Sequence, residues 1–306
     1  MAKPTRIVLT GAALALTLTG CAAGGSDPAT PSDPLGHVHG LGLDPASGET
    51  YAATHDGVWL LPTDQLPGSY PAEDAASTGA PRKIGGNSQD TMGFTVAGPG
   101  LLYASGHPAP GEQTELPTPN LGLIRSTDRA NTWESVSLSG EVDFHDLDTV
   151  PLPDGQTRVY GYDATAGVIR VSDDSGTSWQ EQAAIDLRDL AADPTNPDRL
   201  YATTSNGFLM SEDRGATFDR VEGAPPLYLV DVADDGGGFV GVDVTGQIWS
   251  SDGRSWVKRA MVQGTPEAFA YVGGDDEHWV LIADERGIVA TPDYGETVTV
   301  LTTNEG

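Results

Sequence analysis

The chain has 306 residues, with 44 acidic against 16 basic side chains, so its formal net charge is −28. A surface this negative repels nucleic acid and anionic lipid, which excludes a nucleic-acid-binding protein, and it concentrates cations in any cleft. A single cysteine, Cys21, also excludes a fold held together by disulfides within one chain.

The segment 1–21 has the pattern of an export signal. Lys3 and Arg6 precede an uncharged apolar run, Ile7–Gly20, that is too short to span a bilayer as a permanent helix. The run ends in "LTGC", which resembles the lipobox of bacterial lipoproteins, where the cysteine is acylated and becomes the new N-terminus. We therefore predict that Cys21 is lipidated and that the protein is extracytoplasmic and anchored to the cell membrane. An ordinary secretory peptide with a chance cysteine is the alternative.

A tether follows the signal. Residues 22–36 are rich in Ala, Gly, Pro and Ser and lack apolar periodicity. Cleavage before Cys21 would remove Lys3 and Arg6, which leaves 14 basic against 44 acidic residues and a formal charge of −30. The remaining residues, 37–304, contain the repeats described next.

One strand–turn–strand pattern recurs along the remaining chain. Six segments of the type "YAATHDGVW" align. Each leads from the second strand of a repeat, which is often rich in Tyr and Ala, through a turn into the third strand. They begin at Tyr51, Tyr103, Tyr160, Tyr201, Val240 and Leu281. Residues 71–83 and 108–120 have the composition of insertions in the first two repeats. The pattern predicts an all-β fold, a six-bladed β-propeller that spans 37–304.

A second motif recurs with a period close to forty residues. "SDDSGTSW" at 172–179 has counterparts at 126–133, 211–218 and 291–298, and a shortened one at 250–256. The aligned acids, separated by 46, 39, 39 and 41 residues, are Asp128, Asp174, Asp213, Asp252 and Asp293. This period, with strand-like flanks, is typical of propeller blades.

These stretches resemble the Asp-box, or BNR repeat, S/T-x-D-x-G-x-S/T-W/F. The resemblance implies a turn between the third and fourth strands of a blade, in which the Asp accepts hydrogen bonds from turn amides, on the face away from the usual ligand site. Ala130 replaces the Gly, Val298 replaces the aromatic residue, and the copy that ends at Trp256 is shortened. With "HVHGLGLDP", "DTMGFTVAGPG", "YASGHP" and "DFHDLD", the chain as a whole resembles sialidase-like, glycosylhydrolase-like BNR lipoproteins of actinobacteria.

Histidines gather at one end of the predicted inner strands. Aligning "HGL", "MGF", "HDL" and "RDL" places four residues in register at the channel mouth: His39, Met92, His145 and Arg188. His37 lies two residues before His39, on the same side of its strand. His55 and His107 lie in corresponding loops of the first two blades, whereas His278 falls at the far end of its strand.

Imidazole nitrogen and thioether sulfur together are ligands that copper prefers, and imidazoles alone suit zinc. We therefore predict a metal site, with copper favoured over zinc, whose ligands are His37, His39, His55, Met92, His107 and His145. For each residue alone the alternative is a packing role, since Met92, for example, shares its strand face with Phe94 and Val96.

A glycoside hydrolase is the rival hypothesis. Sialidases of similar fold bind the substrate carboxylate with three arginines, whereas here Arg188 lies on an inner strand and Arg125 and Arg170 lie on third strands. We therefore predict no sialidase activity. A different glycosidase would need two carboxylates roughly 5–10 Å apart. The candidate catalytic residues at the mouth are Asp90, Asp143, Asp146 and Arg188.

A third hypothesis is a propeller that binds a small ligand, a glycan or a protein partner at its mouth without chemistry. This fold serves enzymes and binding modules alike, so the fold does not decide between the hypotheses. The sequence leaves open whether the protein is an enzyme, and it indicates no cofactor other than a metal ion.

Overall fold

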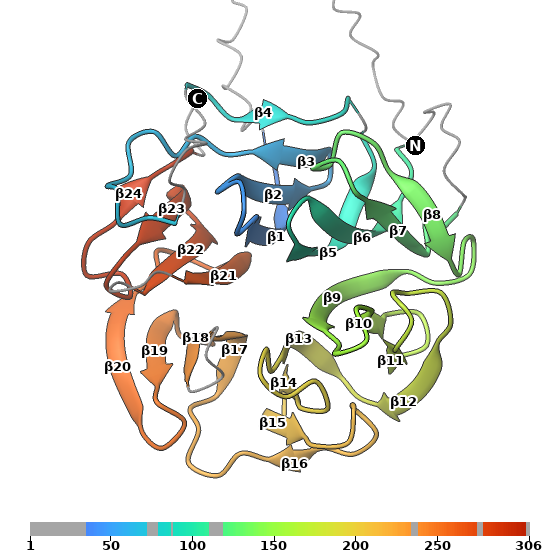
Figure 1. Cartoon of the computed structure of the whole chain (residues 1–306). Coiled ribbons are helices and arrows are strands. Elements are labelled where there is room, and N and C mark those ends of the chain that lie inside the picture. The colour runs from blue at the N-terminus through green and yellow to red at the C-terminus, as the bar shows by residue number, and fades with distance from the viewer. Residues whose placement is uncertain are drawn as a thin grey trace, which may run out of the picture. The chain divides into compact units, whose positions relative to one another are not determined.

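The computed structural model describes residues 35–71, 79–86, 88–109, 119–233, 238–273 and 278–303, and every regular element in these ranges is a β-strand. Six antiparallel sheets of four strands surround a central channel (Figure 1). The prediction of an all-β, six-bladed propeller is confirmed. Cys21, the predicted signal and all but the last two residues of the tether lie outside the described residues. In the part of the chain that is described, no helix is long and apolar enough to cross a membrane.

The blades follow one another in chain order, and within each blade the strands pair in the order of the sequence. The first three blades comprise β1 (Val38–Leu43), β2 (Thr50–Thr54), β3 (Gly57–Leu60), β4 (Arg82–Lys83); β5 (Asp90–Gly98), β6 (Leu101–His107), β7 (Leu123–Ser126), β8 (Glu134–Ser137); β9 (Phe144–Pro151), β10 (Thr157–Asp163), β11 (Val168–Ser172), β12 (Gln180–Ala184). The last three comprise β13 (Leu187–Ala192), β14 (Leu200–Thr204), β15 (Gly207–Ser211), β16 (Asp219–Arg220); β17 (Leu227–Val232), β18 (Phe239–Asp243), β19 (Gln247–Ser251), β20 (Trp256–Met261); β21 (Ala268–Gly273), β22 (Trp279–Asp284), β23 (Gly287–Thr291), β24 (Thr299–Val300). The first predicted insertion ends in β4, so its last residues supply the fourth strand of blade one.

The second strand of each blade is sandwiched between neighbouring sheets. Every residue of β2 and β14 is buried, which explains why segments such as "TYAAT" contain Tyr, Ala and Thr and no charged side chain. Strands that are covered on both faces lose the apolar–polar alternation of half-exposed strands. The repeated sequence of the second strands therefore follows from the packing of neighbouring blades against each other.

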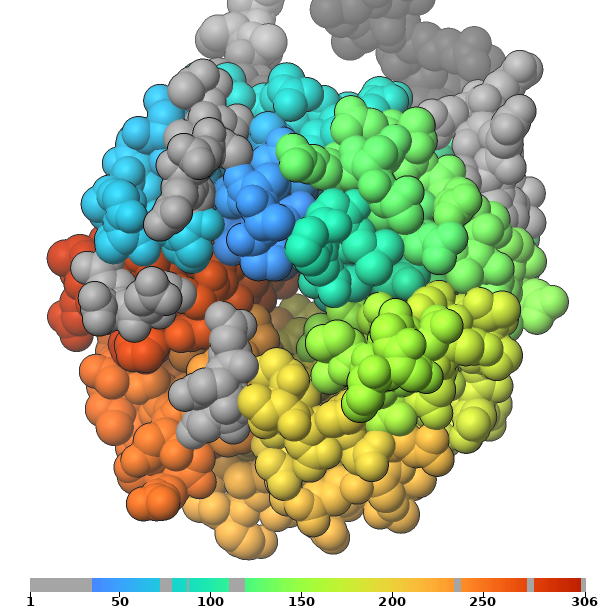
Figure 2. Space-filling model, in the orientation of Figure 1, coloured from blue at the N-terminus to red at the C-terminus, as the bar shows by residue number. Residues whose placement is uncertain are grey.

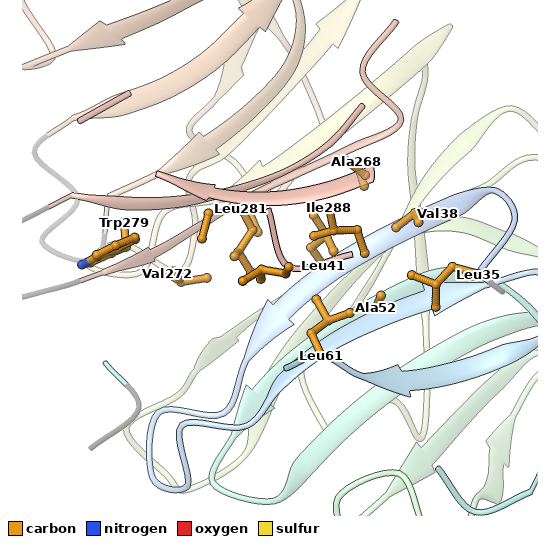
Figure 3. Packing of buried hydrophobic residues seen from close by; sticks show 14 of the residues in the cluster. Leu35, Val38, Leu41, Ala52, Leu61, Ala268, Val272, Trp279, Leu281 and Ile288 are labelled. Carbon is orange, nitrogen blue, oxygen red and sulfur yellow. The ribbon is translucent and has the colours of Figure 1, made fainter. Parts of the chain in front are cut away.

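The ring closes by side-chain packing between the first and last blades. Leu41 of β1 packs in one cluster with Leu281 and Ile288 of the last blade (Figure 3). Trp279 joins this cluster and meets the ring of Tyr70 edge-on, with 5.2 Å between the ring centroids. All four strands of both blades come from contiguous chain. Closure therefore uses no strand exchanged between the two ends.

Carboxylates on the channel wall tie neighbouring inner strands together. Each accepts a hydrogen bond from a backbone N–H of the next blade: Asp146 from Leu190 (2.8 Å), Asp148 from Ala192 (2.7 Å), Asp189 from Val230 (2.7 Å) and Asp231 from Tyr271 (2.7 Å). Burial raises the pKa of Asp146 to about 7 and that of Asp148 to about 6, and it raises the pKa values of Asp189 and Asp231 well above the usual range. These acids have a structural role that their sequence positions did not reveal.

The raised pKa of Asp231 predicts that this carboxyl group lowers the stability of the fold by an amount that depends on pH. The folded state holds this proton more tightly than the unfolded chain, so the carboxyl destabilises the fold increasingly as pH rises above the unfolded pKa of about 4. Burial is the main cause, and the negative charges of Asp148 and Asp189 add to it. Urea unfolding should therefore show that Asp231→Asn becomes more stable relative to the wild type when the pH is raised from 5 to 8. Asp186→Asn, at an exposed position, is the control and should show no such gain.

The recurring Asp turns connect the third strand of a blade to the fourth. Asp174 accepts hydrogen bonds from Ser178 N (2.8 Å), Ser178 Oγ (2.6 Å) and Ser172 Oγ (2.8 Å). Equivalent bonds form at Asp128, Asp213 and Asp293. In the shortened turn, Asp252 accepts from the amides of Arg254 and Ser255, which are nearer in sequence. Ala130 takes the left-handed conformation (φ 63°) that Gly176 and Gly215 take elsewhere. Because antiparallel strands alternate in direction, these turns lie at the end of the blades away from the starts of the inner strands.

Candidate functional site

The mouth of the channel is shaped by a β-bulge that recurs near the start of five inner strands. In each strand the pairing register skips one residue: His39, Met92, His145, Arg188 and Tyr228. A bulged residue is re-aimed relative to the regular pleat. The first four are the residues that the sequence alignment placed in register. Tyr228 was missed, although "LYL" at 227–229 matches the other segments.

A cavity of about 340 Å³ lies behind these bulges, in the hollow at the centre of the ring (Figure 2). Its wall includes His39, His145 and Arg188 at the bulges and Asp146, Asp189 and Asp231 farther along the inner strands. Met92 occupies its bulge half-buried and is not among the residues that line this cavity. The cavity wall thus carries two imidazoles and a guanidinium at the bulges, and it carries carboxylates farther along the inner strands.

Two histidines and a carboxylate meet closely on the side of blades one and two. We call His39, His55 and Asp90 the His39 group. Asp90 Oδ1 lies 2.7 Å from His55 Nδ1 and 3.8 Å from His39 Nε2, and the two imidazole nitrogens are 3.2 Å apart. Asp90 begins β5 and pairs with His107 at the end of β6. Gly106 permits this pairing, since a Cβ there would lie 1.9 Å from the Asp90 carbonyl oxygen.

The His39 group combines a buried imidazole with an accessible one. The side chain of His39 is 11% exposed and that of His55 is 52% exposed. Burial, together with the nearby positive charges of His37, His55, His145 and Arg188, lowers the pKa of His39 to about 3. At neutral pH the ring is therefore uncharged, and an uncharged imidazole is the form that binds a metal.

His37 lies beside the His39 group at the junction of the first and last blades. Its ring centroid is 4.6 Å from that of His39 and 5.7 Å from that of His55. Its Nδ1 lies 3.1 Å from Glu267 Oε1, while Glu267 Oε2 accepts the Val38 N–H at 2.9 Å. A carboxylate on one ring nitrogen orients a histidine and leaves the other nitrogen for a ligand.

The other two histidines among the predicted ligands belong to a separate group on blades two and three. We call His107, Asp143 and His145 the Asp143 group. Asp143 Oδ2 lies 2.7 Å from His145 Nε2 and 3.1 Å from His107 Nε2. The five histidines are thus arranged around three carboxylates, and not around the single point that the sequence suggested: His39 and His55 lie at Asp90, His107 and His145 at Asp143, and His37 at Glu267. The sequence predicted Asp90 and Asp143 as candidate catalytic acids, not as metal ligands.

The charges within the Asp143 group support one another. Burial opposes ionisation of Asp143, but hydrogen bonds and positive charge from His145 and His107 outweigh it, and the pKa of Asp143 is lowered. The hydrogen bond to Asp143 in turn raises the pKa of His145, against the effect of burial. The group therefore favours a negative carboxylate flanked by positive charge.

The remaining candidates do not join these groups. The Arg188 guanidinium lies over the ring of Tyr228, 4.2 Å from its centroid. Arg125 pairs with Glu134 and Arg170 with Asp163, both away from the inner strands. His278 contacts Tyr271 through a 3.0 Å hydrogen bond. The carboxylate of Asp146 accepts a hydrogen bond from the backbone N–H of Leu190.

We expect no release of sialic acid from sialosides. Among the described residues that line the central cavity, Arg188 is the only arginine, so a triad that could hold the substrate carboxylate is lacking. A fluorogenic sialoside incubated with the purified protein should be hydrolysed at the rate of the blank. Turnover that disappears in Arg188→Ala would contradict this prediction.

Comparisons with known proteins bear on the fold. No family model matches the chain, and no curated protein matches it. Among solved structures it resembles an ancestral GH74 enzyme (TM-score 0.52, 15% identity, covering 89% of this chain and 39% of that one). It also resembles the GH74 xyloglucanase from Xanthomonas campestris (TM-score 0.52, 17% identity, covering 88% of this chain and 46% of that one). A third similar structure is YCF48 bound to D1 peptide (TM-score 0.52, 15% identity, covering 88% of this chain and 82% of that one).

The chain therefore spans less than half the length of the two GH74 enzymes and about four-fifths of YCF48. At such low identity the likeness shows the propeller fold alone. Its neighbours include hydrolases and a peptide-bound protein, so they leave the function to be argued from the site. None of them shows a sialidase-like or BNR family, and that resemblance stays a prediction.

Proposed function

We propose that this protein is an exported, lipid-anchored propeller that binds a divalent transition-metal ion at the channel mouth through His39, His55 and Asp90. The spacing of three donor atoms carries the proposal. Their separations of 2.7, 3.2 and 3.8 Å bracket the value of about 3.3 Å expected between ligands of a tetrahedral ion with bonds of 2.0–2.1 Å. A small movement of side chains would therefore bring all three within bonding distance of one ion.

The donor set narrows the choice of metal. Two imidazole nitrogens and one carboxylate oxygen suit Zn²⁺ or Cu²⁺, and binding through them does not require the sulfur of Met92. Half-exposed His55 keeps the group open to solvent, which leaves room for a fourth ligand from water, from a bound molecule or from His37. Three protein ligands and one open position are typical of sites that exchange or activate a ligand.

The test is metal analysis of protein purified without a histidine tag. Chelator-treated protein should take up Zn²⁺ or Cu²⁺ in calorimetric titration, and elemental analysis after dialysis should find the ion retained. Protein that retains no more metal than a buffer blank would overturn the proposal.

A glycosidase that acts on a neutral glycan is the second candidate. The raised pKa of Asp146, at about 7, is suited to a general acid, and the nearby charge of Asp146 adds to the effect of burial in raising the pKa of Asp189. Both side chains, however, accept backbone N–H groups of the next blade. We therefore favour metal binding. Hydrolysis of neutral polysaccharides that is abolished by Asp146→Asn and unaffected by chelators would favour the glycosidase.

The lipid anchor has its own test. If Cys21 is acylated, Cys21→Ser should move the protein from the membrane fraction into the medium or leave its signal uncleaved. Membrane fractionation and the mass of the mature N-terminus measure this directly. Unchanged membrane retention of a processed Cys21→Ser chain would refute the anchor.

A further inference from the structure

Arg188 places a positive charge at the channel mouth. It occupies the bulge near the start of β13, and its guanidinium lies over the ring of Tyr228, 4.2 Å from the ring centroid. Among the described residues it forms no ion pair and no side-chain hydrogen bond. Arginines elsewhere in this acidic chain are paired, as Arg158 is with Asp173 and Asp198. A guanidinium stacked on a ring keeps its N–H groups at the edge of its plane, where they can bind an anion.

The carboxyl group next to Arg188 offsets its charge less than an exposed carboxylate would. Asp189 follows Arg188 in β13, and its Oδ2 accepts the backbone N–H of Val230 at 2.7 Å. Burial, with the negative charge of Asp146 added to it, raises the pKa of Asp189 well above its usual range. Asp189 therefore carries less negative charge at neutral pH than an ordinary aspartate, and the charge of Arg188 is less compensated.

A second group that can carry positive charge faces the same cavity. His145 occupies the equivalent bulge of the preceding blade, and both His145 and Arg188 line the cavity of about 340 Å³. The hydrogen bond to Asp143 raises the pKa of His145, against the effect of burial. Burial is the main cause of the lowered pKa of His39, and the positive charges of His145 and Arg188 add to it. The positive potential of both groups therefore reaches one part of the cavity wall.

We infer that the central cavity binds a small organic carboxylate, with the carboxylate group on Arg188 beside His145 and the rest of the molecule along the inner strands. The planar fork of an arginine matches the two oxygens of a carboxylate. Leu147, Leu190 and Leu229 line the wall among the buried acids, so an uncharged body fits there better than a second negative charge. The inference goes beyond the proposed function, because this binding requires no metal ion.

The test uses benzoate, which has one carboxylate and an uncharged body, and its neutral counterpart benzamide. NMR titration of chelator-treated protein should show that benzoate binds and that benzamide binds much more weakly. Arg188→Gln should weaken benzoate binding about 10-fold or more, because hydrogen bonds between charged groups are lost. Tyr228→Leu should weaken it less, since the guanidinium remains but is no longer held by the ring. Arg254→Gln, the same change at an exposed arginine in the Asp252 turn, should have no effect.

The outcomes separate this inference from the metal proposal. Benzoate that binds only Zn²⁺-loaded protein, and equally well in Arg188→Gln, is a ligand of the ion; that result overturns the cavity site and leaves the proposed function intact. The inference is also wrong if neither benzoate nor the smaller acetate binds, or if Arg188→Gln and Arg254→Gln bind alike. Binding to chelator-treated protein that is lost in Arg188→Gln supports the site even if no metal is retained. Arg188 is exposed, so its variant should melt at the wild-type temperature, and a melting curve checks this.

Discussion

Replacing His39 with alanine is expected to lower the affinity of the His39 group for Zn²⁺ by at least about 100-fold, since loss of an outer-shell partner alone typically costs 10–100-fold. His39 is the most buried imidazole of the group, and its lowered pKa keeps it uncharged at neutral pH. It therefore offers a lone pair that does not compete with protons. No other side chain of the group combines burial with a neutral nitrogen donor.

The measurement is calorimetric titration of the chelator-treated protein with Zn²⁺. His278→Ala should leave the dissociation constant unchanged. His37→Ala should weaken binding by roughly 10-fold, because His37 lies beside the three donors and not among them. If His39→Ala binds as tightly as the wild type, the imidazoles are packing residues and the metal proposal is wrong.

Replacing Trp279 with alanine is expected to cost about 3–5 kcal/mol of unfolding free energy. The side chain is 1% exposed and belongs to the cluster that joins the first and last blades. The substitution would leave a cavity beside the ring of Tyr70, at the junction where the ring of blades closes. Figure 3 shows Trp279 at this junction. Chemical denaturation followed by circular dichroism measures the loss.

Trp279→Phe is the matched variant. The indole Nε1 is buried without a hydrogen-bond partner among the described residues, so phenylalanine keeps much of the packing and removes an unsatisfied donor. Its loss should be clearly smaller than that of the alanine variant. Equal losses would show that the junction depends on the full volume of the indole, and a loss below 1 kcal/mol in Trp279→Ala would show that the junction does not hold the ring together.

The fold was predictable because the blades of a propeller repeat the same strands and turns in similar surroundings, so similar residues recur at equivalent positions. Tyr51, Tyr103, Tyr160 and Tyr201 lie in the same sandwiched strand of four blades, so one interpretation applied to all of them. The Asp turns mark the same connection five times. The fourth strand of blade one was not predicted, because β4 is only two residues long and follows an insertion.

The site was predictable only in part. Alignment of the inner strands placed His39, Met92, His145 and Arg188 at equivalent positions, and the structure gives each of them the same bulge. Register alone does not fix the distance between side chains on different strands. It therefore could not show that the histidines divide between Asp90, Asp143 and Glu267. That division depends on which carboxylate each ring reaches.

The contiguity of the blades has a consequence for how the chain folds. Each sheet pairs only strands that are adjacent in sequence, so the strand pairing within a blade needs no segment from elsewhere in the chain. During synthesis, a blade can pair its strands as soon as its own fourth strand has emerged, without waiting for the rest of the chain. The last event is then the docking of the sixth blade on the first. The His39 group, built from the first two blades, would already be assembled at that stage, and a metal ion could bind before the ring is shut.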